Sequence, residues 1–249
     1  MRVVLLTAGR ATRLQPLTDA LPKCLLEIAG ETIVGRAVRI LAQHGIRRFT
    51  VVEGFLGDMV RARLRAAFPA EWFHFVRNDA YATTNNAYSL FLARDPCREP
   101  MLLCDGDVVF DPAVVARLLE DPRADRLAVR TRGGLGDEEM KVEIDGQGRI
   151  VAIGKDLAPA RAAGEAVGLA VFSASLAGRL FAALERRLRR DGGSGEWYES
   201  SFLDLIREGA ALHAVDLGAA RCIEVDTLDD LTQARALFAG PLDLGGPGE

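Results

Sequence analysis

The chain has 249 residues, of which 49% are hydrophobic, and this is enough apolar material for one large α/β domain with a continuous core. Its formal net charge is -4, with acidic and basic residues interspersed, so nucleic acid is not an expected partner. No run approaches the roughly 20 apolar residues of a membrane span, and no secretory signal is recognised at the first residues. We therefore expect a soluble, cytoplasmic protein with no membrane partner.

The cysteines occur singly in apolar or irregular contexts, without the paired spacing of a zinc site or the density of a disulfide scaffold. There are four of them, Cys24, Cys97, Cys104 and Cys222. We expect all four to be reduced and mostly buried.

Short β-branched runs alternate with longer segments of helical periodicity in the first half of the chain, which is typical of a sheet covered by helices on both faces. Strands are predicted at residues 3–6, 47–52, 73–76 and 100–104. Helices are predicted at residues 33–41, 60–68 and 84–94, and another begins at Asp111-Pro112. Gly45 should end the first of these helices, and Thr84 should cap the third.

The second half, from about Arg126, has a different pattern. Residues 139–155 alternate with period two on both sides of a Gly-containing turn, which predicts an inserted antiparallel hairpin. A strand at 165–173, a helix at 175–190, a Gly-rich loop at 191–200 and a further short helix follow. A strand and a helix at 221–238 close the fold, and Thr227 and Asp230 have the spacing of a capping box.

These elements predict an α/β fold, a Rossmann-like three-layer sandwich whose mixed sheet is mostly parallel and carries the inserted hairpin. We expect residues 1–240 to form a single domain. Residues 241–249 are rich in Gly and Pro and should form a flexible tail.

The stretch TAGRATR follows the first predicted strand directly. Small residues let backbone amides around Ala8, Gly9 and Arg10 point into one concavity, where they could bind an anion. Arg10, Arg13 and Lys23 would then surround a triphosphate. This is neither a Walker loop nor the dinucleotide motif GxGxxG, and a tight turn with solvent-facing arginines is the alternative.

Carboxylates follow two strands that are far apart in the sequence. Asp105 and Asp107 come just after the strand at 100–104, where open α/β sheets bind ligands. Glu224 and Asp226 point from one side of the strand near the C-terminus. Together they predict a hard-oxygen site suited to Mg²⁺, which would also hold substrate phosphates. The alternative is that such acids only cap the helices that follow, as Asp111 and Asp230 should.

The opening segment LTAGRATRLQPLTDALPKCLLEIAG resembles the signature AGxGTRLxPLTxxxPKxLxxIxG of the nucleotidyltransferases that make NDP-sugars and related activated alcohols. The stretches YATTNNAYSL, LLCDGDVVF and IEVDTLDDLTQA are similar to the subgroup of phosphocholine, 2-aminoethylphosphonate and inositol 1-phosphate cytidylyltransferases. Ala11 departs from the Gly or Ser that the family commonly has. The resemblance implies magnesium-dependent nucleotidyl transfer in the domain at 1–240, with Arg13 and Lys23 as catalytic cations on the phosphates. It places the metal on Asp107 and Asp226, with Glu224 beside them.

Further residues are candidates for binding the base and the acceptor. The amides of Asn85 and Asn86, between the third strand and the next helix, could read a pyrimidine edge. Asn78, Thr84 and Asp105 are further candidates for binding the nucleotide. The family resemblance suggests that Lys155 binds the acceptor phosphate. Lys141 is a second candidate, although residues 139–145 alternate as an exposed face should.

Two adjacent aromatics follow the Gly-rich loop of the segment 126–200, which we expect to contribute the acceptor site. Trp197 and Tyr198, with Glu199, could enclose an alkylammonium group by cation–π attraction. Alternatively, the aromatics only anchor a helix against the core, since neighbours on a helix cannot both face one point.

These features lead to the hypothesis of a Mg²⁺-dependent cytidylyltransferase. It would transfer CMP from CTP to a small phosphorylated alcohol or amine, such as phosphocholine or 2-aminoethylphosphonate, and release pyrophosphate by direct displacement. The alternatives are a sugar 1-phosphate nucleotidyltransferase that uses UTP or dTTP, and a catalytically silent nucleotide-binding regulatory subunit. The sequence leaves a homodimer open.

Overall fold

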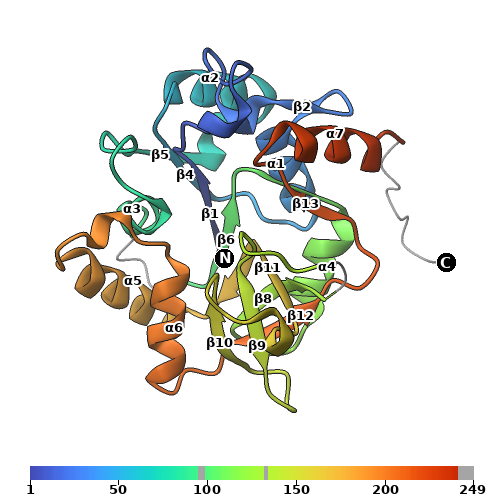
Figure 1. Ribbon diagram of the computed structural model, residues 1–249. Helices are drawn as coiled ribbons and strands as arrows, with labels where there is room; N and C mark the ends of the chain where they lie inside the picture. The colour runs from blue at the N-terminus through green and yellow to red at the C-terminus, as the bar shows by residue number, and fades with distance from the viewer. Residues whose placement is uncertain (95–98, 132–133, 241–249) are drawn as a thin grey trace.

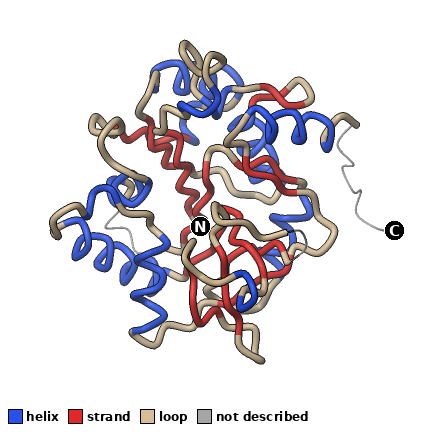
Figure 2. Tube along the Cα trace, viewed as in Figure 1, coloured by secondary structure: helices blue, strands red, loops and turns tan. Residues whose placement is uncertain are grey.

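The computed structural model describes residues 1–94, 99–131 and 134–240, and in these ranges nine strands form one central sheet. Figure 2 shows strands through the middle of the molecule with helices on either side. The nine strands are β1 (Arg2–Thr7), β4 (Phe49–Glu53), β5 (Phe73–Arg77), β6 (Met101–Asp105), β8 (Arg126–Arg130), β9 (Lys141–Ile144), β10 (Ile150–Gly154), β11 (Gly164–Phe172) and β12 (His213–Asp216).

Seven helices are present in the described ranges. They are α1 (Ile33–Gln43), α2 (Gly57–Ala67), α3 (Asn86–Leu92), α4 (Pro112–Glu120), α5 (Ala174–Leu188), α6 (Glu199–Arg207) and α7 (Leu228–Leu237). Short 3₁₀ turns lie at η1 (Thr12–Leu14), η2 (Lys23–Leu25), η3 (Ala70–Trp72), η4 (Pro159–Arg161) and η5 (Gly193–Gly195). No helix in the described part of the chain is long and apolar enough to cross a membrane.

The sheet has the order β10-β9-β11-β6-β1-β4-β5, with β8 paired to β11 and β12. The strands β6, β1, β4 and β5 are parallel, and Val3 of β1 lies between Phe49 and Leu102 of its neighbours. The strand β11 runs antiparallel to β6, β8 and β9, and the hairpin β9–β10 extends that side. The predicted mixed sheet with an inserted hairpin is confirmed, and its antiparallel side is larger than the hairpin alone.

Alternate residues of the central strand belong to cores on opposite faces of the sheet. Val3 and Leu5 pack with α1, α2 and α4, whereas Val4 packs with α3, α5 and α6. Figure 1 shows these two groups of helices on opposite sides of β1 and β6. Because a strand buries both of its faces only when helices cover both, the continuous apolar runs of the sequence produce the predicted three-layer sandwich.

A small two-stranded sheet brings the C-terminal part of the chain to the end of β6. In it β7 (Val108–Phe110) pairs antiparallel with β13 (Cys222–Glu224), and Glu224 lies opposite Val108. The amide of Val225 also donates to the carbonyl of Asp107 over 3.0 Å. A second small sheet joins β2 (Glu27–Ile28) to β3 (Glu31–Thr32). The first of these pairings places two distant acidic segments side by side.

The caps of the helices differ in part from the predictions. Asn85, not Thr84, caps α3, because its side chain accepts from the amide of Asn86. Asp111 precedes α4 without a capping hydrogen bond, since its carboxylate pairs with Arg221. The capping box of Thr227 and Asp230 is confirmed, and residue 45 ends α1 with φ of 80°.

Three of the four cysteines are free and buried as predicted, namely Cys24, Cys104 and Cys222. Burial raises the pKa of the Cys24 and Cys222 thiols to about 12. The predictions for Cys97 and for the tail at 241–249 concern residues outside the described ranges.

Candidate active site

The loop that follows β1 forms one wall of the site. The amide of Phe55 donates to the carbonyl of Ala8 over 3.1 Å, and a Cβ at Gly54 would lie 2.5 Å from that carbonyl, so the loop packs directly on residue 54. Ala11 has φ of 52°, in the left-handed region that Gly adopts more easily. This conformation turns the chain into η1, which presents Arg13.

Two cations from the N-terminal part meet two carboxylates from distant strands. The Nζ atom of Lys23 lies 2.7 Å from Oδ2 of Asp107 and 2.6 Å from Oδ1 of Asp226. Arg13 donates to the other oxygen of Asp226 over 2.6 Å. The structure therefore brings together the four charged residues that the sequence pointed to.

The electrostatics of these pairs are mutually supportive. Desolvation acts to lower the pKa of Lys23, but the attraction of Asp107 and Asp226 outweighs it and raises that pKa above its ordinary value. Desolvation likewise opposes ionisation of Asp226, yet Lys23 and Arg13 hold its pKa below its ordinary value. The Lys23 ammonium and the Asp226 carboxylate are thus both charged near neutral pH.

The carboxylates of Asp107, Glu224 and Asp226 form a set that fits a hard cation. One oxygen from each lies within 4.8 Å of the others. The second oxygen of Asp107 is buried and accepts no hydrogen bond from the described residues. Desolvation, with repulsion from Asp107 and Asp226, raises the pKa of Glu224 to about 8, although the residue as a whole is exposed. A divalent cation would relieve both the unpartnered oxygen and the repulsion.

A cleft of about 280 Å³ connects these residues with the predicted base and acceptor residues. The candidate residues that line it are Ala8, Gly9, Arg13, Lys23, Asn78, Thr84, Asn85, Asp105, Asp107, Lys155, Trp197, Glu199, Glu224 and Asp226. The three candidates Arg10, Lys141 and Tyr198 do not line it.

Those three side chains have other surroundings. The Arg10 guanidinium lies over the ring of Phe55, 5.6 Å from its centre. Lys141 is buried, so the expected exposed face is wrong there, and its ammonium donates to the carbonyls of Gly136 and Glu139. The ring of Tyr198 is buried against Phe202, which leaves Trp197 as the exposed member of the pair. The two aromatics, which immediately precede α6, therefore face different environments.

Tyr198 and Asp105 form a buried hydrogen bond beneath the cleft. The phenol donates to Oδ2 of Asp105 over 2.7 Å, while Oδ1 has no partner among the described residues. Burial, together with the charges of Asp107 and Glu199, raises the pKa of Asp105 well above its ordinary value. A Cβ at Gly168, whose φ is 68°, would lie 2.8 Å from Oδ2 of Asp105. Asp105 is thus tightly packed at the base of the cleft.

The predicted base-reading amides hold the Gly-rich loop in place. Asn85 donates from its amide side chain to the carbonyl of Gly195, and its backbone amide donates to Ser194. The side-chain oxygen of Asn86 accepts from the amide of Tyr198 over 2.8 Å. These contacts span more than 100 positions of sequence, and no local pattern indicates them.

The buried Asn78 is held in the same region. It donates to the hydroxyls of Thr84 and Ser89 and accepts from the amide of Ala80. Its amide therefore fixes the turn that precedes α3 at the edge of the cleft.

The end of the cleft where the sequence predicts acceptor binding contains Lys155, Trp197 and Glu199. The Lys155 ammonium lies 4.7 Å from the centre of the Trp197 ring and 3.3 Å from a carboxylate oxygen of Glu138. Glu199 is buried, and desolvation raises its pKa to about 7. Its Oε2 atom has no hydrogen-bond partner in the described part of the chain. A buried carboxylate with one unpartnered oxygen at the cleft wall is suited to a cationic ligand.

Further residues line this cleft, and those that sequence reasoning missed include Glu138, Glu139, Met140 and Glu165. The first three form the end of the stretch DEEM, of which only Glu139 was assigned to an exposed strand face. With them the acceptor half of the cleft is rich in carboxylates, which favours a ligand that carries positive charge.

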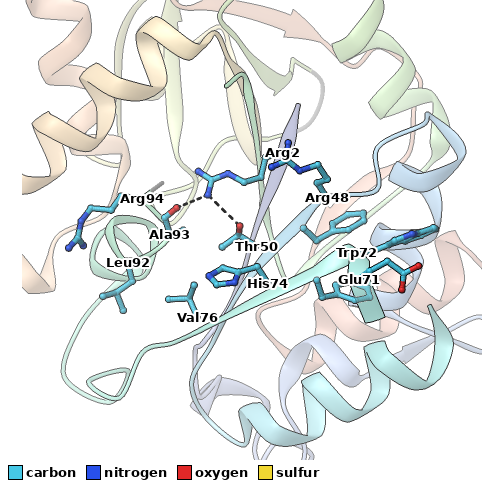
Figure 3. Close-up of a pocket in the computed structure, with 12 residues that line it drawn as sticks. Arg2, Arg48, Thr50, Glu71, Trp72, His74, Val76, Leu92, Ala93 and Arg94 are labelled. Atoms are coloured by element: carbon cyan, nitrogen blue, oxygen red, sulfur yellow. Dashed lines mark hydrogen bonds between the residues drawn. The ribbon is translucent and has the colours of Figure 1, made fainter. Parts of the chain in front are cut away.

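A larger cavity of about 470 Å³ lies elsewhere, and Figure 3 shows its lining. It opens beside the first residues of β1, β4 and β5, including Arg2, Thr50 and His74, and the Arg2 guanidinium donates there to Thr50 and to the carbonyl of Ala93. The carboxylate triad lies at the other end of the parallel strands. Open α/β sheets bind ligands beyond the carboxyl ends of their strands, so we place the site in the smaller cleft.

The fold and this cleft together define a nucleotidyltransferase. A family model described as the MobA-like NTP transferase domain matches residues 3–204, and the chain belongs to that family. The resemblance expected from the sequence is thereby confirmed.

Two relatives are similar over most of this chain. One is CMP-5'-(3-aminopropyl)phosphonate synthase from Streptomyces rubellomurinus, 32% identical over 97% of this chain, which spans 39% of the length of that relative. The other is 2-aminoethylphosphonate cytidylyltransferase from Lancefieldella rimae, 28% identical over 92% of this chain and 89% of the relative.

Solved structures share the fold. CTP:phosphocholine cytidylyltransferase from Streptococcus pneumoniae is 19% identical with a TM-score of 0.76, covering 95% of this chain and 98% of that one. The inositol-1-phosphate CTP transferase from T. maritima is 23% identical with a TM-score of 0.76, covering 99% and 98%. At these identities the likeness shows the architecture alone.

Proposed function

We propose that this chain is a Mg²⁺-dependent cytidylyltransferase that transfers CMP from CTP to a small phosphonate or phosphate bearing an amine, with release of pyrophosphate. The observation that carries the proposal is the single cleft in which Arg13 and Lys23 meet Asp107 and Asp226. Cations for phosphates and acids for a metal are the two sets of groups that nucleotidyl transfer needs. The two relatives named above support CTP as the donor, since one is named as the synthase of a CMP-phosphonate and the other as a cytidylyltransferase for an aminophosphonate.

The residues of the chain suit a direct displacement. An anionic acceptor oxygen attacks the α-phosphorus of CTP, a new P–O bond forms, and the bond to pyrophosphate breaks with its electron pair leaving on that group. Arg13 and Lys23 neutralise the triphosphate and hold it in line with the acceptor. Mg²⁺ held by Asp107, Glu224 and Asp226 would supply further charge neutralisation at the phosphates.

Proton transfer by a side chain is not needed, because the acceptor oxygen is already ionised near neutral pH. In the described part of the chain, no histidine lines the cleft. This agrees with catalysis by positioning and charge neutralisation rather than by a general base.

An amine is favoured over a quaternary ammonium as the cationic group of the acceptor. Tyr198 is buried, so Trp197 alone presents an exposed ring, and the Lys155 ammonium already lies over it. A primary ammonium can instead donate hydrogen bonds to the unpartnered oxygen of Glu199, which a trimethylammonium group cannot do. We therefore place 2-aminoethylphosphonate ahead of phosphocholine.

A matrix of donors and acceptors tests the proposal. Pyrophosphate release is measured with CTP, UTP and dTTP, each against 2-aminoethylphosphonate, phosphocholine and glucose 1-phosphate, with and without MgCl₂. We expect turnover with CTP, Mg²⁺ and an amine-bearing acceptor. Turnover of glucose 1-phosphate alone would identify a sugar 1-phosphate nucleotidyltransferase, and nucleotide binding without pyrophosphate would identify a regulatory binding subunit.

A further inference from the structure

A second chamber of about 490 Å³ adjoins the acceptor end of the cleft. Met140, Lys155, Trp197 and Glu199 line both spaces, so these four side chains form the wall between them. The chamber lies between β10 and α6, which Figure 1 shows beside each other. It therefore shares a wall with the site that the proposed reaction uses, and that reaction does not require the chamber for an acceptor of two carbons.

One face of α6 lines the chamber along its length. Glu199, Leu203 and Arg207 line it at intervals of four residues, which places them in a row along the helix. Eight residues of helix rise by about 12 Å, so Arg207 stands well beyond the wall at Glu199. The chamber thus leads from the acceptor subsite to an arginine.

The lining of the chamber changes in character along this row. Apolar side chains from β10 and the turn after it, with Leu203 of α6, cover its middle, namely Ala152, Ile153, Leu157 and Leu203. Asp156 lines the chamber next to the wall residue Lys155. Asp156 and Arg207 are exposed, and neither forms an ion pair with any residue in the described ranges. Two opposite charges that do not pair with each other remain available for a ligand with both charges.

We propose, resting on the function proposed above, that the acceptors of this enzyme include phosphonates or phosphates with an amino-acid head at the far end. The anionic phosphorus group lies at Lys155, and a short alkyl stem crosses the apolar middle of the chamber. At the far end, the carboxylate of the head pairs with Arg207 and its ammonium group faces Asp156. The reaction is the same displacement at the α-phosphorus of CTP, and the chamber selects only which acceptor enters.

Two matched acceptors test this assignment. They are 2-amino-5-phosphonopentanoate and 4-aminobutylphosphonate, which differ only in the carboxylate on the amine-bearing carbon. We expect kcat/KM for the first to exceed that for the second by about tenfold, the effect of one charge-assisted bidentate contact. Equal values for the two acceptors would overturn the assignment.

Variants locate the effect in the chamber. Arg207→Ala, at an exposed residue, should remove the preference for the carboxylate and bring the ratio of the two kcat/KM values to about one. Leu203→Trp should lower turnover of both long acceptors about tenfold relative to 2-aminoethylphosphonate by filling the apolar middle. Arg190→Ala removes another exposed arginine that does not line the chamber and should leave the preference intact. An unchanged ratio in Arg207→Ala would overturn the role of that residue.

Two measurements distinguish failure of the chamber assignment from failure of the proposed function. Pyrophosphate release from CTP with 2-aminoethylphosphonate tests the reaction without using Arg207. Calorimetric titration of 2-amino-5-phosphonopentanoate into the protein with CTP absent tests the chamber without using turnover. Binding that weakens about tenfold in Arg207→Ala supports the chamber even if no turnover occurs, and binding that the variant leaves unchanged contradicts it.

Discussion

Lys23 contacts carboxylates that a metal ion would also bind, and its ammonium could bind the substrate phosphates instead. Its ammonium lies 2.7 and 2.6 Å from two carboxylates of the triad, on the side where a divalent cation would bind. A triphosphate offers the ammonium a second set of oxygens. We infer that substrate draws Lys23 toward the phosphates and leaves Asp107 and Asp226 to the metal.

This predicts opposite effects of Lys23→Ala on two measurements. Turnover should fall about 10²- to 10³-fold, because one electrostatic contact to the transferring group is lost. Binding of Mg²⁺ in the absence of nucleotide should become tighter, since the ammonium no longer competes for the carboxylates, and calorimetry measures this directly. Arg10→Ala, which removes a cation of the same loop from outside the cleft, should do neither. Weaker Mg²⁺ binding in Lys23→Ala would contradict the competition.

Glu199 should make the stability of the ligand-free protein depend on pH. Its pKa is about 7 in the folded protein and ordinarily 4.5, so between these values the folded state holds a proton that the unfolded state has lost. The contribution of Glu199 to stability therefore falls as pH rises through this interval, by on the order of 3 kcal/mol in all.

Urea unfolding of the wild type and of Glu199→Gln at several values from pH 5 to pH 8 measures this contribution. We expect the free energy of unfolding of the wild type to fall, relative to the variant, as pH rises toward 8. If the difference in free energy of unfolding between the two proteins does not change with pH, the pKa of Glu199 is not raised in the folded protein. A cationic acceptor should reduce the decline, because it stabilises the ionised carboxylate.

At the scale of elements, the turn η5 connects α5 to the segment that carries Trp197 and Glu199. A Cβ at Gly193 would lie 2.0 Å from the carbonyl oxygen of Arg187, whereas a Cβ at Gly195 meets no atom within 4 Å. Asn85 and Asn86 hold the other side of this segment. The acceptor wall thus depends on how closely η5 packs on the end of α5.

Gly193→Ala and Gly195→Ala form a matched pair for this element. Gly193→Ala should lower the free energy of unfolding by about 1 to 3 kcal/mol, since the added methyl group displaces backbone. It should also raise KM for the acceptor several-fold while leaving the affinity for CTP nearly unchanged. Gly195→Ala should leave all three quantities near their wild-type values. Equal acceptor KM values in the two variants would show that η5 does not position the acceptor wall.

The elements that the sequence predicted well are those whose burial is complete on one or both faces. Val3 to Leu5 are apolar on both faces, and α1 has a clear apolar stripe, so both follow from local pattern. The edge strand β12 (His213–Asp216) is short and half-buried, and β7 has three residues, so their pairing depends on partners far along the chain. Local pattern cannot specify such partners.

At the scale of the molecule, the same distinction applies to the site. The position of acids just after strands indicates where Asp107 and Asp226 lie, because the carboxyl ends of the strands form one edge. Periodicity could not place Lys141, which is buried through contacts with carbonyls of its own loop, nor the long-range partners of Asn85. The charged centre was therefore predictable, and the packing around the acceptor was not.

The central claim is that cations from the N-terminal loop and acids from two distant strands form one site for a metal-bound triphosphate. The affinity for CTP, measured by calorimetry with and without Mg²⁺ in the wild type and in Asp107→Asn, tests it most directly. We predict that Mg²⁺ tightens CTP binding at least about tenfold in the wild type. In Asp107→Asn, whose folding is checked by circular dichroism, Mg²⁺ should leave the affinity for CTP unchanged. If Mg²⁺ tightens CTP binding equally in both proteins, Asp107 does not hold the metal and the account is wrong.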